Sequence, residues 1–388
     1  MKNLRWIVFL GVSFVIIVAG FSLLDVSNAD TVTASPVFSN VPLSTVGFDR
    51  AIDPYDWQFP EDYGPHPNFQ TEWWYYTGNL ATEEGRRFGY QLTVFRRAIL
   101  PMSESADSES EWRTNQLYMA HFTLTDIEAG RFFHDERFSR GGADLAGAES
   151  TPYHVWLDNW QIMAVDEDAL FTQISAQMED VHIDFMLEQV KPPALQGVNG
   201  LSAKSEDLGN ASYYYTLSRL VTQGTITIGE ESFQVSGTSW KDHEFSTSAL
   251  GTTALGWNWF GLQFDDGREL MVGQIRQVDG AIDPYFGGLL IDEDGSTEYL
   301  DAQDFTITAL DTWDSPHSEA VYPSGWDIHV QLENGDTLDF TATPQLIDQE
   351  LAGGLITYWE GSVRLSGDVT GYGYTELTGY ADSVTGRF

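Results

Sequence analysis

Residues 71–96 read TEWWYYTGNLATEEGRRFGYQLTVFR, two runs of aromatic and β-branched residues around an acidic turn that ends in glycine. Runs of this composition, bounded by Gly, Asp or Asn, are typical of β-strands. The short ATEEG connection favours an antiparallel hairpin. Rings occupy both faces of the first strand, because Trp73 and Trp74 point to opposite sides. A strand with rings on both faces is buried on both sides, as the wall of a closed barrel is.

A second hairpin of the same kind begins the second half of the chain. Residues 255–276, LGWNWFGLQFDDGRELMVGQIR, repeat the order of aromatic strand, acidic-glycine turn, arginine and second strand. Strand-like runs follow both hairpins, about eight of them in the second half, near the number whose closed barrel holds one small ligand. The repeat predicts an all-β protein of two similar domains with little helix. We place the N-terminal domain at 65–247 and the C-terminal domain at 248–388.

The N-terminus has the pattern of a targeting segment. Basic residues precede the apolar run Trp6–Leu24, and small residues around Ala29 fit a cleavage site. We expect residues 1–29 to be a signal peptide or, because the run is near membrane-spanning length, a retained anchor that associates with the membrane. Both alternatives predict export to the periplasm or the extracellular space. Residues 30–64 are polar and Pro-containing, and we expect an extended leader pinned to the body by aromatic residues.

Composition excludes several classes of protein. With 388 residues, 42% hydrophobic and 14% aromatic, the chain can form a large core and is not disordered. Lys and Arg number 19 against 58 Asp and Glu, and a formal charge of −39 argues against nucleic-acid partners. The acidity is typical of a solvated surface. The chain has no Cys, and therefore no disulfide, thiolate metal site or cysteine nucleophile.

No sequence motif points to a cofactor or a metal. The chain has no nucleophile elbow, paired-histidine zinc motif, P-loop or dinucleotide fingerprint. The DEDGS segment at 292–296 resembles the start of a calcium loop, but the glycine and glutamate that such a loop needs further on are absent. We predict no cofactor, no metal site, and a hydrophobic small molecule as partner. The sequence does not predict an oligomeric state.

The strand GTSWKDHEFS at 237–246 places two carboxylates beside an indole. With a period of two residues, Trp240, Asp242 and Glu244 share one face. One interpretation is a solvated face, because charged residues are mostly exposed. The other is an acid pair that faces a cavity. In that case burial and the like charge raise the pKa of one carboxyl group, which becomes a general acid near neutral pH.

Two further residues are candidates for chemistry. Glu72 precedes four aromatic rings, so it is either a carboxylate in an aromatic environment or a structural residue paired with Arg96 or Arg140. His121, in the strand YMAHFTLTD, is either a hydrogen-bonded structural histidine or a group that titrates near neutral pH and takes part in catalysis. Both alternatives stay open for each residue.

Several motifs together resemble one known family. HPNFQTEWWYYTGNL, MAHFTLTD, SGTSWKDHEFST, GWNWFGLQFDDGRELMVGQIR, YWEG and GYGYTELTGY are similar to the AttH-like, carotenoid 1,2-hydratase-related family of secreted lipocalin-like proteins. The resemblance covers residues 64–382. It implies two lipocalin-like antiparallel β-barrel domains packed together, with a ligand site in or between them. At Asp242-His243-Glu244-Phe245 this chain departs from the Asp-Arg-Glu-Trp that secreted members commonly carry.

The resemblance also implies a reaction. Carotenoid hydratases protonate a terminal C=C bond of an apolar polyene and add water to the tertiary cation, which needs a strong acid in a dry aromatic pocket. We expect a hydrophobic, isoprenoid- or lipid-like ligand and acid-promoted hydration or isomerisation. The alternatives are a non-catalytic carrier or envelope stress protein, and a secreted hydrolase. The candidate catalytic residues are Asp242, Glu244, Glu72 and His121, and the candidate ligand-binding residues are Trp73, Trp74, Tyr75, Tyr214, Trp240, Trp257, Trp259, Trp359 and Tyr374.

Overall fold

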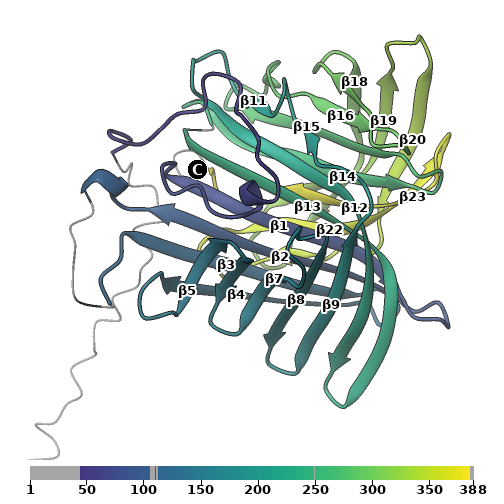
Figure 1. The fold of residues 1–388 in the computed structure, drawn as a ribbon. Helices are drawn as coiled ribbons and strands as arrows, with labels where there is room; N and C mark the ends of the chain where they lie inside the picture. The colour runs from purple at the N-terminus through teal and green to yellow at the C-terminus, as the bar shows by residue number, and fades with distance from the viewer. Residues whose placement is uncertain (1–43, 105–109, 111, 249, 385–388) are drawn as a thin grey trace, which may run out of the picture.

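The computed structural model describes residues 44–104, 110, 112–248 and 250–384 (Figure 1). This part of the chain is built almost entirely of antiparallel strands, and its helices are two 3-10 turns, η1 (Glu61–Tyr63) and η2 (Met102–Glu104). Within these ranges no helix has the length and apolarity of a membrane span. The predicted all-β class is confirmed. The predicted signal peptide, 1–29, lies outside the described residues.

The first sheet contains 13 strands in the order β4-β3-β2-β1-β13-β12-β9-β8-β7-β6-β5, with β10 and β11 paired to β12. Contacts of β3 and β4 with β5 and β6 bring its two ends together, so the sheet is nearly closed into a barrel. Its strands are β1 (Thr71–Ala81), β2 (Arg87–Ala98), β3 (Gln116–Asp126), β4 (Arg131–Arg140), β5 (Ala146–Ser150), β6 (Tyr153–Leu157), β7 (Trp160–Ala164), β8 (Phe171–Met178), β9 (Val181–Gln189), β10 (Ala194–Leu195), β11 (Leu201–Ala203), β12 (Ala211–Ile228) and β13 (Glu231–Ser248).

The second sheet contains 10 strands in the order β17-β16-β15-β14-β23-β22-β20-β19-β18, with β21 paired to β22. Its strands are β14 (Ala254–Phe264), β15 (Glu269–Gln277), β16 (Gly288–Ile291), β17 (Thr297–Leu300), β18 (Phe305–Asp314), β19 (Val321–Gln331), β20 (Thr337–Pro344), β21 (Glu350–Leu351), β22 (Tyr358–Gly367) and β23 (Gly371–Leu377). The change of sheet falls between Ser248 and Ala254, next to the predicted domain boundary.

The two sheets repeat one topology, as the paired hairpins predict. In each sheet the first strand lies between the second strand and the last, β1 between β2 and β13, and β14 between β15 and β23. The hairpin turns correspond as well. Gly85 has a φ of 92° and Gly267 a φ of 90°, a conformation that glycine adopts without a steric penalty. The prediction of two packed lipocalin-like barrels is therefore confirmed.

Each barrel has its own apolar core. Large residues such as Trp74, Tyr76 and Trp160 fill the first barrel, and Trp326, Tyr322 and Trp359 are in the core of the second. A third cluster of buried residues contains side chains from both sheets and lies between them. The core positions alternate along the strands with residues of the opposite face. The opposite faces of the central strands therefore meet at the interface between the barrels.

The central strands of the two sheets pack against one another, with β1 on β23 and β2 on β22 (Figure 1). Asn79 Nδ2 donates to the carbonyl oxygen of Gly373 at 3.0 Å. The approach is close at Gly89, where an added Cβ would lie 2.9 Å from Cβ of Ser362. The described part of the predicted leader, 44–64, lies along the surface of the first barrel. There Trp57 Nε1 donates to Asn199 O at 3.2 Å.

Candidate functional site

A cavity lies where the opposite faces of the two sheets meet. With its mouth included, it holds about 860 Å³ of space free of protein atoms. Strands β1, β2, β3, β12 and β13 of the first barrel line it from one side, and β14, β15, β22 and β23 of the second barrel from the other. Eight of the lining residues are aromatic: Trp73, Tyr75, Phe95, Tyr214, Trp257, Trp259, Phe286 and Tyr358. Such a concave, mostly apolar site with a few polar groups is typical of small-molecule binding.

Strand register brings acids into this aromatic lining. On β13, Asp242 and Glu244 alternate with core residues and face the cavity. Their partners on β1 are rings, with Tyr75 opposite Asp242 and Trp73 opposite Glu244. Of the two interpretations of this strand, the structure shows the cavity-facing one. Asp242 is only 4% exposed.

Asp242 accepts three hydrogen bonds, and no Lys, Arg or His of the described residues lies within ion-pair distance of it. Oδ1 accepts from Trp240 Nε1 at 2.8 Å and from Thr216 Oγ1 at 2.6 Å, and Oδ2 accepts from the Tyr214 hydroxyl at 2.7 Å. Burial raises the pKa of Asp242 to about 7, although these three bonds lower it, and the charge of Glu244 adds to the rise. Asp242 therefore exchanges a proton near neutral pH, as a general acid must.

Glu244 differs from Asp242 because it has a cation. Lys204 Nζ lies 3.1 Å from Glu244 Oε1, and both side chains are buried. Burial lowers the pKa of Lys204, and the neighbouring Glu244 opposes that effect. The two acids of this strand thus have different surroundings, which is the arrangement that separates proton donor from charged partner in acid-base sites.

A second pair of acids was missed by the sequence reasoning. Glu376 on β23 lines the cavity, and Glu360 on β22 lies directly opposite it in the strand register. The Tyr75 hydroxyl donates to Glu360 Oε1 at 2.7 Å, which connects this pair to the first barrel. The sequence feature that could have identified this pair is an acid within an aromatic strand, in YWEG and GYGYTEL. The same pattern made Glu72 a candidate.

His121 connects the cavity to the protein surface. Its Nδ1 lies 2.7 Å from the hydroxyl of Tyr358, a cavity residue, and its Nε2 lies 3.0 Å from Oε2 of Glu136. Burial opposes ionisation of Glu136, but the bond and charge of His121 lower its pKa. Glu136 is partly exposed. Neither Glu136 nor Tyr358 was among the predicted residues, because contacts between distant strands leave no mark in a local pattern.

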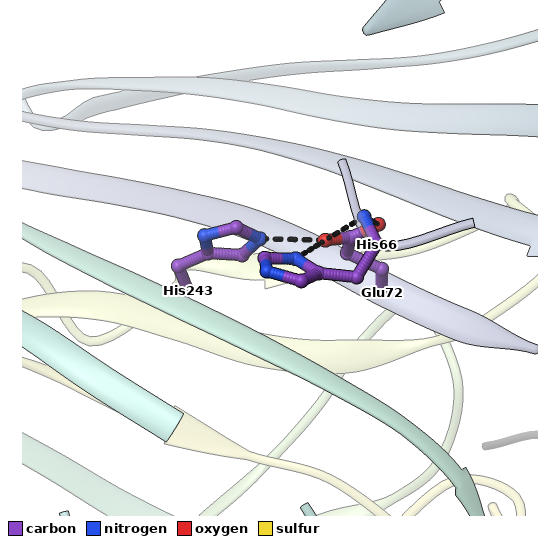
Figure 2. A group of neighbouring side chains, drawn as sticks. All are labelled: His66, Glu72 and His243. Atoms are coloured by element: carbon purple, nitrogen blue, oxygen red, sulfur yellow. Dashed lines mark hydrogen bonds and ion pairs between the residues drawn. The ribbon is translucent and has the colours of Figure 1, made fainter. Parts of the chain in front are cut away.

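Glu72 does not line the cavity and has the pairing that the structural alternative required. It is fully buried in the first barrel, and Arg96 Nε donates to its Oε2 at 2.8 Å. His66 Nδ1 and His243 Nε2 both lie 2.8 Å from Oε1 (Figure 2). Burial opposes ionisation, but Arg96 and the two histidines lower the pKa of Glu72 well below its ordinary value.

His66, Glu72 and His243 are also the group best placed to hold a metal ion in the described part of the chain. Their ligand atoms lie within 4.8 Å of one another. Both rings are hydrogen-bonded to the same carboxylate oxygen, and Arg96 occupies the other oxygen. A metal ion would have to displace ring protons and lie beside a guanidinium cation. The arrangement fits a buried ion-pair network better than a metal site.

The predicted ligand-binding residues fall into two groups. Trp73, Tyr75, Tyr214, Trp257 and Trp259 line the cavity, as do Asp242, Glu244 and His121. The others are buried away from the lining: Trp74 in the first core, Trp359 in the second, and Trp240 and Tyr374 in the cluster between the barrels. Trp240 supports the site indirectly, through its bond to Asp242.

Comparison with known proteins agrees with this architecture. The family model described as AttH-like matches residues 50–380. A crystal structure of a Nitrosomonas europaea protein assigned as an AttH is 34% identical, with a TM-score of 0.76, and the match covers 86% of this chain and 100% of that one. No curated protein matches the chain.

A more distant structure has the same fold. Kievitone hydratase from Nectria haematococca is 16% identical, with a TM-score of 0.63, and the match covers 88% of this chain and 98% of that one. At this identity the likeness shows the fold alone. The family match extends over most of the residues that form both barrels and the cavity between them, and this chain therefore belongs to the AttH-like family.

Proposed function

We propose that this protein binds a lipophilic, isoprenoid- or lipid-like molecule between its barrels and protonates a C=C bond of that molecule, with Asp242 as the acid. The observation that carries the proposal is a buried carboxyl group in an aromatic cavity, with no ion-pair partner in the described part of the chain. The pKa of Asp242, raised by burial to about 7, leaves a large fraction of the group protonated at neutral pH.

The proposed reaction balances as a hydration. The Asp242 carboxyl group gives its proton to one alkene carbon, and the π electrons form the new C–H bond. The other carbon becomes a tertiary cation, which the faces of neighbouring rings stabilise. A water molecule adds to that carbon and loses a proton, so that alkene and water become an alcohol. If the cation loses a different proton instead, the product is an isomerised alkene.

The surroundings of Asp242 suit this chemistry. Tyr214 and Thr216 are hydroxyl donors that stabilise the carboxylate left after proton transfer, and each can turn when the carboxyl group is protonated. Trp240 Nε1 donates to Oδ1, the oxygen that also accepts from Thr216. The carboxyl group is therefore fixed toward the cavity in both protonation states, as preorganised catalysis requires.

Export belongs to the proposal as well. It rests on the N-terminal segment alone, with Trp6–Leu24 followed by small residues. Kievitone hydratase is by name a hydratase, but at 16% identity its name does not assign a reaction to this chain. The proposed reaction therefore rests on the residues of this cavity.

A non-catalytic carrier with the same cavity is the second candidate. The same aromatic lining favours it, because rings and aliphatic side chains bind apolar molecules whether or not a reaction follows. The two candidates differ in what Asp242 does, since a carrier needs no proton transfer.

Deuterium transfer from solvent tests the proposal. The full-length protein is incubated with squalene or lycopene in D₂O, and products are extracted for mass spectrometry. We expect deuterium in an alcohol or an isomerised alkene with the wild type and none with Asp242→Asn, while both bind N-phenylnaphthylamine alike. Asp180→Asn, at an exposed position in the β8–β9 turn, is the control. Equal deuterium incorporation by Asp242→Asn and the wild type would refute the acid assignment, and binding without any incorporation would favour the carrier.

A further inference from the structure

Glu360 and Glu376 form a carboxyl pair that the reaction proposed above does not use. They face each other across the β22–β23 ladder. Like charges at directly opposite positions of neighbouring strands are destabilising. Among the described residues, neither has a Lys, Arg or His partner within ion-pair distance, whereas the buried acids Glu72, Glu244 and Glu269 each have one. Two neighbouring acids without a cation, of which Glu360 is fully buried, cannot both carry a charge cheaply.

Two of the four carboxyl oxygens of the pair accept a hydrogen bond from a neighbouring side chain. Tyr75 donates to Oε1 of Glu360 at 2.7 Å, and Trp257 Nε1 donates to Oε1 of Glu376. Oε2 of Glu360 is buried and has no donor in the described part of the protein, and the side chain as a whole is 0% exposed. The neighbouring carboxyl group of Glu376 can fill that place only when one of the two acids carries a proton. The pair therefore shares a proton, as closely spaced acids do.

The geometry points to Glu376 as the second acid-base residue of the cavity, which accepts the proton from the water that adds to the cation, with Glu360 as its positioning residue. This inference rests on the proposed function. Glu376 lines the same cavity as Asp242 and comes from the opposite barrel, whereas Glu360 lies behind it. An acid on one side of a substrate and a base on the other is the arrangement that hydration needs.

The protonation states agree with these roles. Burial and the charge of Glu376 raise the pKa of Glu360 well above its ordinary value, so Glu360 holds its proton. Burial raises the pKa of Glu376 to about 7, Glu360 and Trp257 oppose the rise, and the charges of Asp242 and Glu244 add to it. At neutral pH a carboxylate at Glu376 and a carboxylic acid at Asp242 therefore coexist in part of the molecules.

The steps balance in protons and electrons. Asp242 gives its proton to the alkene, water oxygen forms the C–O bond, and one O–H bond of that water breaks as its proton passes to Glu376. Asp242 then is a carboxylate and Glu376 a carboxylic acid. Exchange with solvent water returns both groups to their starting states, and no oxidant or reductant takes part.

The ionisable groups around the pair come from four strands and one loop. They are Tyr75 on β1, Asp242 and Glu244 on β13, Tyr358 on β22, Tyr374 on β23, and Lys204 beyond β11. Lys204, the cation among these groups, bonds to Glu244. The surroundings are thus acidic, which favours a protonated pair.

Two isosteric variants separate the roles of the two acids. The amide introduced by Glu360→Gln keeps a donor toward Glu376 and so imitates protonated Glu360, whereas Glu376→Gln leaves no oxygen that takes up a proton from water. Incubation of squalene in D₂O and H₂¹⁸O with the full-length protein measures protonation as deuterium and hydration as ¹⁸O in the alcohol. We expect Glu376→Gln to lower ¹⁸O incorporation about 100-fold or more while deuterium still enters the recovered alkene. Glu360→Gln should lower ¹⁸O incorporation by only about threefold, because its amide still donates toward Glu376.

The control is Glu350→Gln, which changes a buried acid of the second barrel that bonds to Tyr322 away from the cavity. Equal hydration by Glu376→Gln and the wild type, or equal losses for Glu360→Gln and Glu376→Gln, would overturn the inference. Asp242→Asn should lose deuterium and ¹⁸O together, which separates the acid from the base.

If the wild type leaves squalene unchanged, the protonation of the carboxyl pair can be measured without substrate to test the inference. Infrared difference spectra between about pH 5 and about pH 9 show which carboxyl groups lose protons. We expect Glu376→Gln to remove a carboxylic-acid band that disappears near neutral pH, and Glu360→Gln to remove a band that persists to high pH. If neither variant changes the bands of the wild type, the pair shares no proton and the inference is wrong, whatever the alkene does.

Discussion

Asp242→Asn is expected to change the way in which the stability of this protein depends on pH. The pKa of Asp242 is raised by burial to about 7 in the folded protein, whereas an unfolded Asp titrates near about 4. Between these values the folded state binds more protons than the unfolded state. The contribution of Asp242 to the free energy of unfolding is therefore fully present at low pH and falls as pH rises toward about 7. Asparagine stays neutral and does not contribute this fall.

The size of the effect follows from the pKa difference. Each unit of pKa difference corresponds to about 1.4 kcal/mol. Between about pH 5 and about pH 8, the Asp242 contribution falls across about two pH units that lie below its folded pKa. This fall lowers the free energy of unfolding by about 2–3 kcal/mol. The amide also loses an acceptor, because Tyr214, Thr216 and Trp240 all donate to the carboxylate, and we expect a pH-independent cost of about 1 kcal/mol from one mismatched bond. The variant is thus less stable than the wild type at low pH and more stable at high pH.

Urea unfolding of the full-length protein, followed by tryptophan fluorescence at several pH values, measures this difference. The quantity to compare is the stability of Asp242→Asn minus that of the wild type, and it should rise by about 2–3 kcal/mol between about pH 5 and about pH 8. Asp180→Asn, at an exposed turn, should give a flat difference. A flat line for Asp242→Asn, or a fall with rising pH, would refute a raised pKa and with it the role of Asp242 as an acid at neutral pH.

Three further outcomes are expected. Arg96→Met leaves the Glu72 carboxylate buried without its cation, and urea unfolding should show a loss of about 3–5 kcal/mol, whereas a loss below about 1 kcal/mol would contradict the buried pair. Decyltrimethylammonium should bind more tightly than decanol in calorimetry, with a ratio that grows as pH rises and Asp242 and Glu376 ionise; a constant ratio would speak against both raised pKa values. Tyr358→Phe removes the buried partner of His121 and should cost about 1–2 kcal/mol, and an unchanged stability would mean that the bond does not form in solution.

The fold could be predicted from the sequence because strand composition and turn glycines are local features, and both hairpins carry them. Residues 71–96 combine strand composition with a turn that needs a glycine, and Gly85 has the positive φ that such turns require. The second hairpin repeats the pattern, and Gly267 repeats the conformation. The motif resemblance then supplied the lipocalin-like barrel that the family match supports.

The site was predicted less completely, because a period of two residues shows which side chains share a face but not what that face meets. Asp242 and Glu244 shared a face and both line the cavity. Trp73 and Trp74 were both proposed as ligand contacts, yet they point to opposite sides of β1, and Trp74 is in the core of the first barrel. Glu376 was missed because its significance depends on Glu360, a partner that only strand pairing identifies.

The position of the cavity explains why two barrels are needed. Side chains such as Trp74 and Trp160 fill the first barrel and Trp326 the second, so the described aromatic cavity is not inside either of them. It forms where their outer faces meet, and each barrel supplies a cavity acid whose pKa burial raises to about 7, Asp242 from the first and Glu376 from the second. Neither barrel alone has both groups or an enclosed aromatic wall. The proposed chemistry therefore requires that the two domains associate.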